Sequence, residues 1–206
     1  MEYQYETDSF PFVKAKHFKD IVQKRQVRLV VIHTTEALET GDSAEGTANY
    51  FKDPRNQHGN PVKVSSHLCI DNNSIVQCVW DNDVAYCAPG VNSDGIHLEL
   101  AATSAQTAAQ WADPYSTLVL EKAANAAAQY CLKYDIPRVH LSNQQLRDGK
   151  KGIIGHYQAT AVYPPNAGHT DPGANFPWDS FVERVETLYQ ERKERLDNEQ
   201  ALAAEA

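Results

Sequence analysis

The sequence predicts an α/β fold in which a single mixed β-sheet is flanked by helices. Apolar runs rich in β-branched residues are typical of buried strands, and helix-forming segments alternate with these runs along the chain. The chain of 206 residues can bury one substantial core, and nothing in it requires a second core. The predicted strands lie near residues 27–33, 67–71, 74–80 and 95–101.

Turn and helix patterns support the strand assignment. Asn72 and Asn73 supply a turn between the second and third strands, which predicts a hairpin. Helices are predicted over residues 44–51, 118–134 and about 178–196, the second with an alanine-rich composition and one apolar face that favours the core. We therefore expect an N-terminal arm over 1–26, one catalytic domain over 27–196 and a flexible acidic, alanine-rich tail over 197–206.

Composition and charge narrow the class of partner. The formal net charge of −8 argues against a nucleic-acid partner, which normally meets a basic stripe. The acidic N-terminal segment lacks the basic and apolar regions of a secretory signal, and no segment has the composition of a stable membrane span. The four cysteines show no metal-binding spacing, so we expect mostly buried free thiols. Cys69 and Cys78 flank the predicted hairpin, and one bridge between them stays open as an alternative.

Three separated residues have the chemistry of a catalytic zinc site. His33 ends the first predicted strand, His156 follows a short strand-like Gly-Ile-Ile-Gly run, and Asp171 lies in a Thr-Asp-Pro-Gly turn. Two imidazoles and one carboxylate leave a fourth tetrahedral position open, as catalytic zinc requires. Two other readings compete: a histidine after a strand is more often an ordinary polar residue, and Asp171 fits plain turn chemistry.

A resemblance to a known family strengthens the metal-site interpretation. The motifs, in chain order, are Ile-His-Thr-Thr-Glu at 32–36, Thr-Ala-Asn-Tyr-Phe at 47–51, Val-Ser-Ser-His-Leu at 64–68, Gly-Ile-His-Leu-Glu-Leu at 95–100, Gly-His at 155–156 and Thr-Asp-Pro-Gly-x-x-Phe-Pro-Trp at 170–178. In this order they resemble type 2 N-acetylmuramoyl-L-alanine amidases, a family related to peptidoglycan-recognition proteins. The resemblance runs from roughly residue 27 to 185 and implies the corresponding fold.

The resemblance also implies a reaction and its residues. It implies a Zn²⁺ hydrolase that cuts the amide between N-acetylmuramic acid and the L-alanine of the stem peptide. His33, His156 and Asp171 match the zinc ligands, and Glu99 matches the catalytic glutamate. The chain departs from the family at His97, where glycine is common, and at His169, where many members have lysine.

The chemistry of amide hydrolysis suggests a role for each matched residue. Glu99 would take a proton from the attacking water and pass one to the leaving amine, and His169 would stabilise the developing oxyanion. Two alternatives stay open: Glu99 as an exposed strand carboxylate, and His169 as a third histidine ligand in place of Asp171. Candidate substrate-binding residues are His67, Tyr86, Asn92 and His97, with core packing as the competing interpretation.

The expected site of synthesis and action follows from the absence of a recognised secretory signal in the sequence. We expect synthesis in the cytoplasm and action on the cell wall, as for a bacteriophage endolysin released by a holin-type lesion. The expected partner is peptidoglycan or its soluble muropeptide fragments, and a monomer is favoured. The alternatives are a cytosolic muropeptide-recycling amidase, a non-catalytic peptidoglycan-binding protein and a structural or regulatory phage protein.

Overall fold

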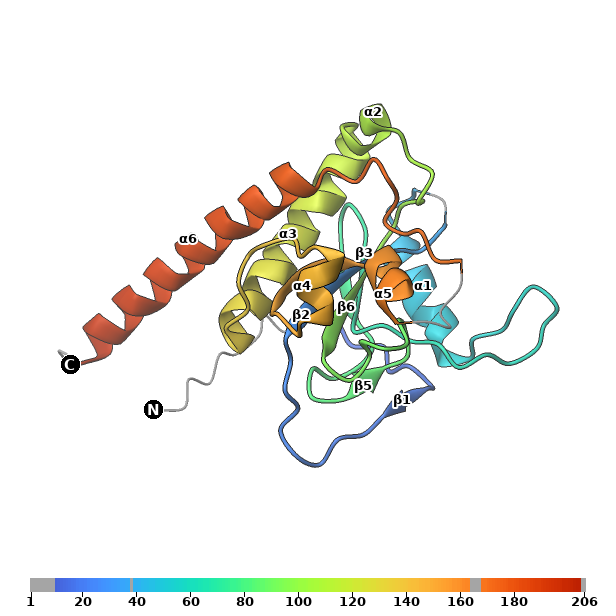
Figure 1. Cartoon of the computed structure of the whole chain (residues 1–206), viewed down its shortest axis with the longest axis horizontal. Coiled ribbons are helices and arrows are strands. Elements are labelled where there is room, and N and C mark those ends of the chain that lie inside the picture. The colour runs from blue at the N-terminus through green and yellow to red at the C-terminus, as the bar shows by residue number, and fades with distance from the viewer. Residues whose placement is uncertain (1–9, 38, 164–167, 205–206) are drawn as a thin grey trace.

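A five-stranded mixed sheet forms the centre of the molecule (Figure 1). The computed structural model describes residues 10–37, 39–163 and 168–204. The strand order is β4-β3-β6-β2-β7, with β2, β3, β6 and β7 parallel and β4 antiparallel to β3. The strands are β2 (Leu29–Thr34), β3 (Leu68–Ile70), β4 (Ile75–Gln77), β6 (Gly95–Leu100) and β7 (Gly152–Gly155). The predicted mixed sheet and the hairpin at Asn72 and Asn73 are confirmed.

Helices cover both faces of this sheet. They are α1 (Ser43–Lys52), α2 (Ala108–Trp111), α3 (Pro114–Tyr134), α4 (Asn143–Arg147), α5 (His156–Val162) and α6 (Trp178–Ala204). Side chains of β2 alternate between the two faces, since Val30 and Ile32 join the core under α3 and α6. Leu29 and Val31 face the core formed with α4 and α5. His33 continues this second set and therefore points to the face of α5.

Two helices have ends that differ from the predicted ones. The helix α3 begins at Pro114, because the Asp113 side chain accepts the Ser116 N–H and caps the first turn. The helix α6 continues to Ala204, beyond the predicted end at residue 196, so residues 197–204 are helical rather than a flexible tail. Figure 1 shows α6 running alongside α3 and extending past it toward the C-terminus.

The described part of the N-terminal arm packs onto the domain. Strand β1 (Phe18–Lys19) pairs with β5 (Val84–Ala85) in a small second sheet, and Ala15 and Arg25 are buried. Residues 10–26 are therefore continuous with the domain rather than detached from it, whereas residues 1–9 of the predicted arm lie outside the described residues.

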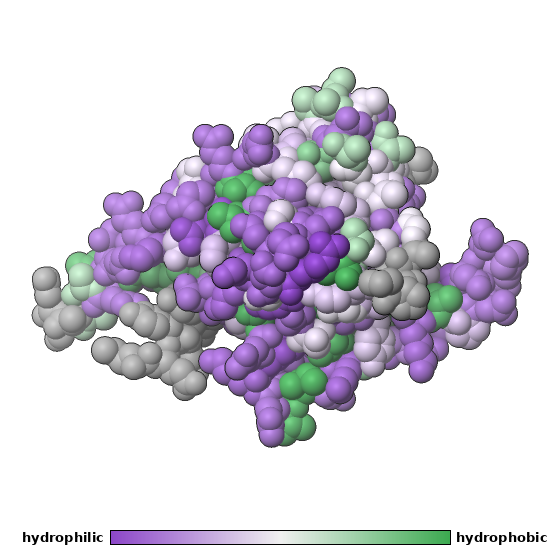
Figure 2. Space-filling view, viewed as in Figure 1, coloured by the Kyte–Doolittle hydropathy of each residue, from purple (hydrophilic) through white to green (hydrophobic). Residues whose placement is uncertain are grey.

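The four cysteines are free thiols, and the sulfur atoms of Cys69 and Cys78 lie 3.7 Å apart without a bond. Figure 2 shows a largely hydrophilic face, on which apolar residues form small separate patches. Among the described residues, no helix has both the length and the apolar composition that a membrane crossing requires.

Candidate active site

Three parallel strands end beside one another at the same edge of the sheet. In the strand register, His33 of β2 lies opposite Glu99 of β6, and Ile32 lies opposite Gly155 of β7. His156 follows Gly155 directly as the first residue of α5. This edge, outside the carboxyl ends of parallel strands, is where open α/β sheets usually place ligands.

A turn brings Asp171 to the same edge from a distant part of the sequence. The N–H of Tyr157 donates to the Asp171 carbonyl oxygen at 3.0 Å, which ties the turn to α5. A Cβ at Gly155 would lie 2.7 Å from Cδ of Pro172, so only glycine permits this close approach. Asp171 is buried, and its carboxylate points toward His33 and His156.

The donor atoms of these three residues have the spacing of a zinc site. His33 Nδ1 lies 3.2 Å from His156 Nδ1, and each nitrogen lies 3.2 Å from Asp171 Oδ2. Ligands about 2.0–2.1 Å from a tetrahedral zinc are separated by about 3.3–3.4 Å. The three residues present therefore fit a zinc ion by donor type and by spacing, and they leave one coordination position open.

The ionisation of the metal-free site also suits a cation. Burial lowers the pKa of His33 to about 4, so its imidazole is neutral at neutral pH and has a lone pair to offer. Burial alone would raise the pKa of Asp171, but hydrogen bonds from His156 and His33 hold it well below its usual range. The site thus presents a neutral His33 imidazole and an ionised Asp171 carboxylate, the protonation states that metal ligands need.

Glu99 lies next to this site and holds its proton unusually tightly. Burial and the charge of Asp171 raise the pKa of Glu99 to about 8. The Cys87 thiol donates a hydrogen bond to Glu99 Oε1 at 3.2 Å. Burial and the charge of Glu99 raise the pKa of Cys87 well above its ordinary value, so the sulfur stays protonated and acts as a donor.

Cys87 is a site residue that the sequence analysis overlooks. It is partly exposed and lines the same pocket as His33 and Glu99. The only signal available was its position within the 85–90 segment, beside the candidate residue Tyr86. A cysteine without metal-binding spacing gives no indication of which carboxylate it will meet.

His169 lies at the rim of the site. Its ring stacks on His156 with centroids 4.0 Å apart, and its Nδ1 lies 3.8 Å from Asp171 Oδ1. The side chain is 55% exposed, whereas that of Asp171 is 10% exposed. Burial and the neighbouring His156 lower the pKa of His169, so the ring is mainly neutral at neutral pH and can donate one N–H.

His67 and His97 lie behind the site rather than in its wall. Both are fully buried, and neither is among the residues that line the pocket. His33 Nε2 is 3.0 Å from His97 Nδ1, and the His97 ring stacks on His67 with centroids 5.6 Å apart. The expected direct contact of these two histidines with substrate is corrected accordingly, since the folded chain covers both rings.

The other two candidate substrate-binding residues have different surroundings. Tyr86 is partly exposed and lines the pocket. Asn92 instead shapes the loop beneath it, because its Oδ1 accepts the backbone N–H groups of Cys87 and Ala88 at 3.0 and 2.7 Å. Asn92 is not among the residues that line this pocket, and its side chain holds the backbone of Cys87 in place.

An open pocket gives access to these groups from solvent. It has a volume of about 760 Å³ and extends from the three metal-ligand candidates to α1 and the start of the 64–87 segment. Tyr50 and Tyr86 contribute aromatic surface, and Thr35, Thr47 and Ser43 contribute hydroxyl groups. Such a mixture of aromatic and hydroxyl groups can contact both the apolar and the polar parts of a glycopeptide.

The metal-free protein is expected to become less stable on acidification. Burial lowers the pKa of His33 to about 4 and, with the charge of Arg25, that of His67 to about 3. An unfolded histidine titrates near ~6.5, so below that pH the unfolded chain binds more protons. Each histidine therefore contributes stability that is present above about pH 6.5 and is lost toward its folded pKa, by up to about 1.4 kcal/mol per pH unit.

The ionisation of Glu99 has the opposite effect on stability, because it makes the folded protein more stable as the pH falls. Its raised pKa of about 8 gives a contribution that is complete below the unfolded value near ~4.3 and is lost as the pH rises through 8. Denaturant unfolding in chelator between pH 7.5 and 5 measures the net slope. Glu99→Gln should make the loss on acidification steeper, and a slope identical to the wild type would contradict the pKa of about 8.

Comparisons with known proteins were made for sequence and for structure. A family model described as N-acetylmuramoyl-L-alanine amidase matches residues 23–174. Comparison with curated proteins finds no matching sequence.

Three solved structures show the same fold at low sequence identity. An AmpD derivative has a TM-score of 0.60 at 18% identity and covers 88% of this chain and 95% of its own. The Staphylococcus aureus hydrolase AmiA has a TM-score of 0.56 at 16% identity, covering 88% and 84%. A mutant endolysin from Bacillus subtilis has a TM-score of 0.52 at 16% identity, covering 86% and 99%.

Proposed function

Since the chain belongs to the N-acetylmuramoyl-L-alanine amidase family, we propose that it uses one zinc ion, held by His33, His156 and Asp171, to hydrolyse peptidoglycan. The bond cut is the amide between the lactyl group of N-acetylmuramic acid and the L-alanine of the stem peptide. The main support for this proposal is the 3.2 Å spacing of the donor atoms of His33, His156 and Asp171. Glu99, whose raised pKa suits proton transfer, lies next to them.

Glu99 is the proton carrier of the reaction. When bound, zinc supplies a positive charge that polarises the scissile carbonyl and activates water for attack. Glu99 takes the proton of the attacking water and returns a proton to the leaving amine nitrogen. A pKa near the working pH suits both halves of this transfer, and the raised pKa of Glu99 supports the assignment.

Neighbouring side chains hold Glu99 in place. The Cys87 thiol donates to Oε1, which keeps the carboxyl group oriented. Asn92 fixes the backbone of Cys87, so the donor does not drift from the carboxylate. The pocket beyond these groups, with Tyr50 and Tyr86 in its lining, receives the glycan and the stem peptide.

His169 stabilises the negative charge that develops on the carbonyl oxygen. Replacement of His169 by alanine is expected to lower kcat by about 10²–10³-fold with zinc retained, as for loss of one oxyanion donor. His169→Lys should keep activity, and should hold it to higher pH if charge assists the donor. Steady-state kinetics with metal analysis checks both variants.

The same two variants test the alternative ligand set. Loss of zinc from His169→Ala, together with full zinc in Asp171→Ala, would reverse the ligand and oxyanion roles. Full activity of zinc-loaded His169→Ala would leave His169 with neither role.

Mass spectrometry of digested peptidoglycan tests the reaction itself. Purified cell walls are incubated with the protein, with and without a chelator. Release of intact stem peptides bearing a free L-alanine amine, abolished by the chelator and restored by zinc, is the expected result. Products with a different new terminus, or undiminished release in chelator, would refute the proposed zinc amidase.

The biological setting proposed is host-wall degradation during phage lysis. In this setting the protein is made in the cytoplasm and reaches the wall through a holin-type lesion. In this setting it acts as a monomer. Comparing intact walls with soluble muropeptides in the same assay distinguishes this role from muropeptide recycling, for which only the soluble substrate would be cleaved efficiently.

A further inference from the structure

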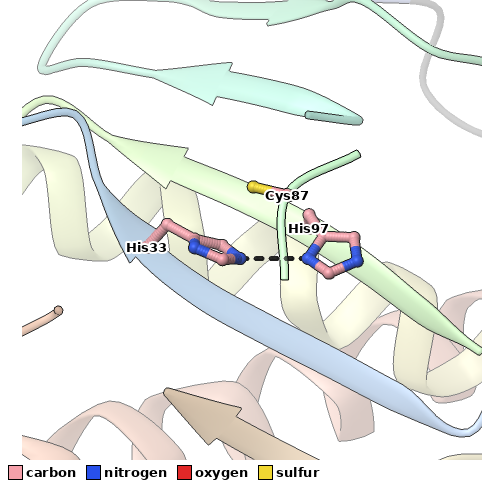
Figure 3. Close-up of side chains that lie close together, drawn as sticks. All are labelled: His33, Cys87 and His97. Carbon is pink, nitrogen blue, oxygen red and sulfur yellow. Dashed lines mark hydrogen bonds between the residues drawn. The ribbon is translucent and has the colours of Figure 1, made fainter. Parts of the chain in front are cut away.

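The outer nitrogen of His33 meets a second buried imidazole instead of a carboxylate or a backbone carbonyl. His33 Nε2 lies 3.0 Å from His97 Nδ1, as the dashed line between β2 and β6 shows in Figure 3. The other ring nitrogen of His33, Nδ1, faces His156 and Asp171. The His33 ring thus spans the distance between the metal-ligand group and His97, and both histidines are buried.

The direction of this hydrogen bond follows from the ligand assignment. A neutral imidazole that gives the lone pair of one nitrogen to a metal carries its proton on the other nitrogen. With Nδ1 of His33 toward the metal, the proton is on Nε2 and points at His97 Nδ1. His97 must therefore accept through Nδ1 and carry its own proton on Nε2.

The fold holds His97 in the orientation that this role requires. The Ser66 hydroxyl donates to the His97 carbonyl oxygen at 2.9 Å, and the His97 N–H donates to Nδ1 of His67 at 3.1 Å. A Cβ at Gly95 would lie 3.1 Å from Nε2 of His97, so the glycine two residues earlier leaves room for the ring. These contacts set the position of His97 independently of any metal.

The hydrogen bonds of the His97 ring show that this residue does more than fill space in the core. Within the described part of the chain, Nε2 of His97 is buried and has no hydrogen-bond partner. A buried polar nitrogen without a partner costs about 1–3 kcal/mol, which an apolar side chain at this position would avoid. Among residues 10–37, 39–163 and 168–204, the side chain of His97 makes one hydrogen bond, to His33, and this bond explains why a histidine stands here.

We propose that His97 is a positioning residue that accepts the Nε2 proton of His33, fixing the tautomer and ring orientation in which His33 binds zinc. The inference rests on the proposed function, because it requires His33 to be a ligand. Partners of this kind orient a metal-bound histidine and increase its basicity, and their loss typically weakens metal binding about 10- to 100-fold.

A matched pair of variants separates the hydrogen bond from packing. His97→Asn keeps an acceptor oxygen near the position of Nδ1, whereas His97→Leu fills similar space without an acceptor. Zinc affinity is measured for both by competition with a chromogenic chelator, with circular dichroism as the check on folding. We expect zinc binding about 10- to 100-fold weaker in His97→Leu and close to the wild-type value in His97→Asn.

Wild-type affinity in folded His97→Leu, or equal weakening in both variants, would overturn the proposal. If His97→Leu does not fold, nitrogen-15 NMR of the zinc-loaded wild type decides the matter. Protons on Nε2 of both His33 and His97, with Nδ1 of His97 unprotonated, support it, and a proton on Nδ1 of His97 overturns it.

These measurements also separate this inference from the proposed function. A wild-type protein that binds no zinc refutes the proposed ligand set itself. A wild type that binds zinc, with both variants unchanged, refutes only the role of His97.

Discussion

Glu99→Gln is expected to lower turnover by about 10²–10⁴-fold while the fold and the zinc content stay unchanged. Glutamine preserves the shape of the side chain and can still contact the Cys87 thiol, but its amide cannot take the proton of the attacking water. Glu99 is not among the proposed zinc ligands, whose donor atoms lie 3.2 Å apart. Replacing it should therefore leave metal binding intact. Release of free L-alanine amines from purified walls gives the rate, and elemental analysis gives the zinc content.

A matched control for this variant is available on the opposite face of the sheet. Glu183 is an exposed residue of α6, which packs against α3, so Glu183→Gln makes the same chemical change away from the pocket. It should have wild-type turnover. Wild-type turnover in a folded, zinc-loaded Glu99→Gln would remove Glu99 from the mechanism.

Alanine at His33, His156 or Asp171 should abolish zinc binding and activity together. Each substitution removes one of the three donor atoms. The expected loss of zinc affinity exceeds about 100-fold, the upper end of the effect for residues that only support a ligand. Chelator competition measures the affinity, and the wall-digestion assay measures the activity of the same preparations.

His58→Ala is the corresponding control, because His58 is exposed in the loop after α1 and does not line the pocket. It should bind zinc as the wild type does. Stoichiometric zinc retained by all three ligand variants would exclude this ligand set, whereas loss from only two of them would identify which residue is not a ligand.

Local sequence patterns were sufficient for much of the fold. The β-branched run ending at His33 and the Asn72 and Asn73 turn predicted strands and a hairpin that the structure contains. The length of the last helix could not be predicted well, because the charged segment after residue 190 fits an exposed helix and a frayed tail equally. Helix α3 began earlier than predicted because its start depends on the Asp113 cap.

The meeting of His33 and His156 could be predicted from their places at the ends of strands, whereas the roles of Asp171 and Glu99 followed from the family resemblance. His33 and His156 adjoin strand ends, and parallel strands bring such ends to one edge, so their proximity follows from the topology. The sequence does not show which segments of the folded chain bury a given side chain. Alternation along a strand puts His97 and Glu99 on the same face of β6, but this pattern does not show which of the two side chains the folded chain buries.

Local patterns were therefore enough to predict the sheet, the alternation of its faces and the residue types suited to binding zinc and carrying a proton. How these residues meet depends on the folded arrangement of distant segments. The register between β2 and β6 sets Glu99 opposite His33, and the loop held by Asn92 brings Cys87 onto Glu99. The same packing buries His97 against His33. The physical reason is that hydrogen-bond partners and burial depend on segments far apart in the chain, whereas strand and helix patterns report only on neighbours along it.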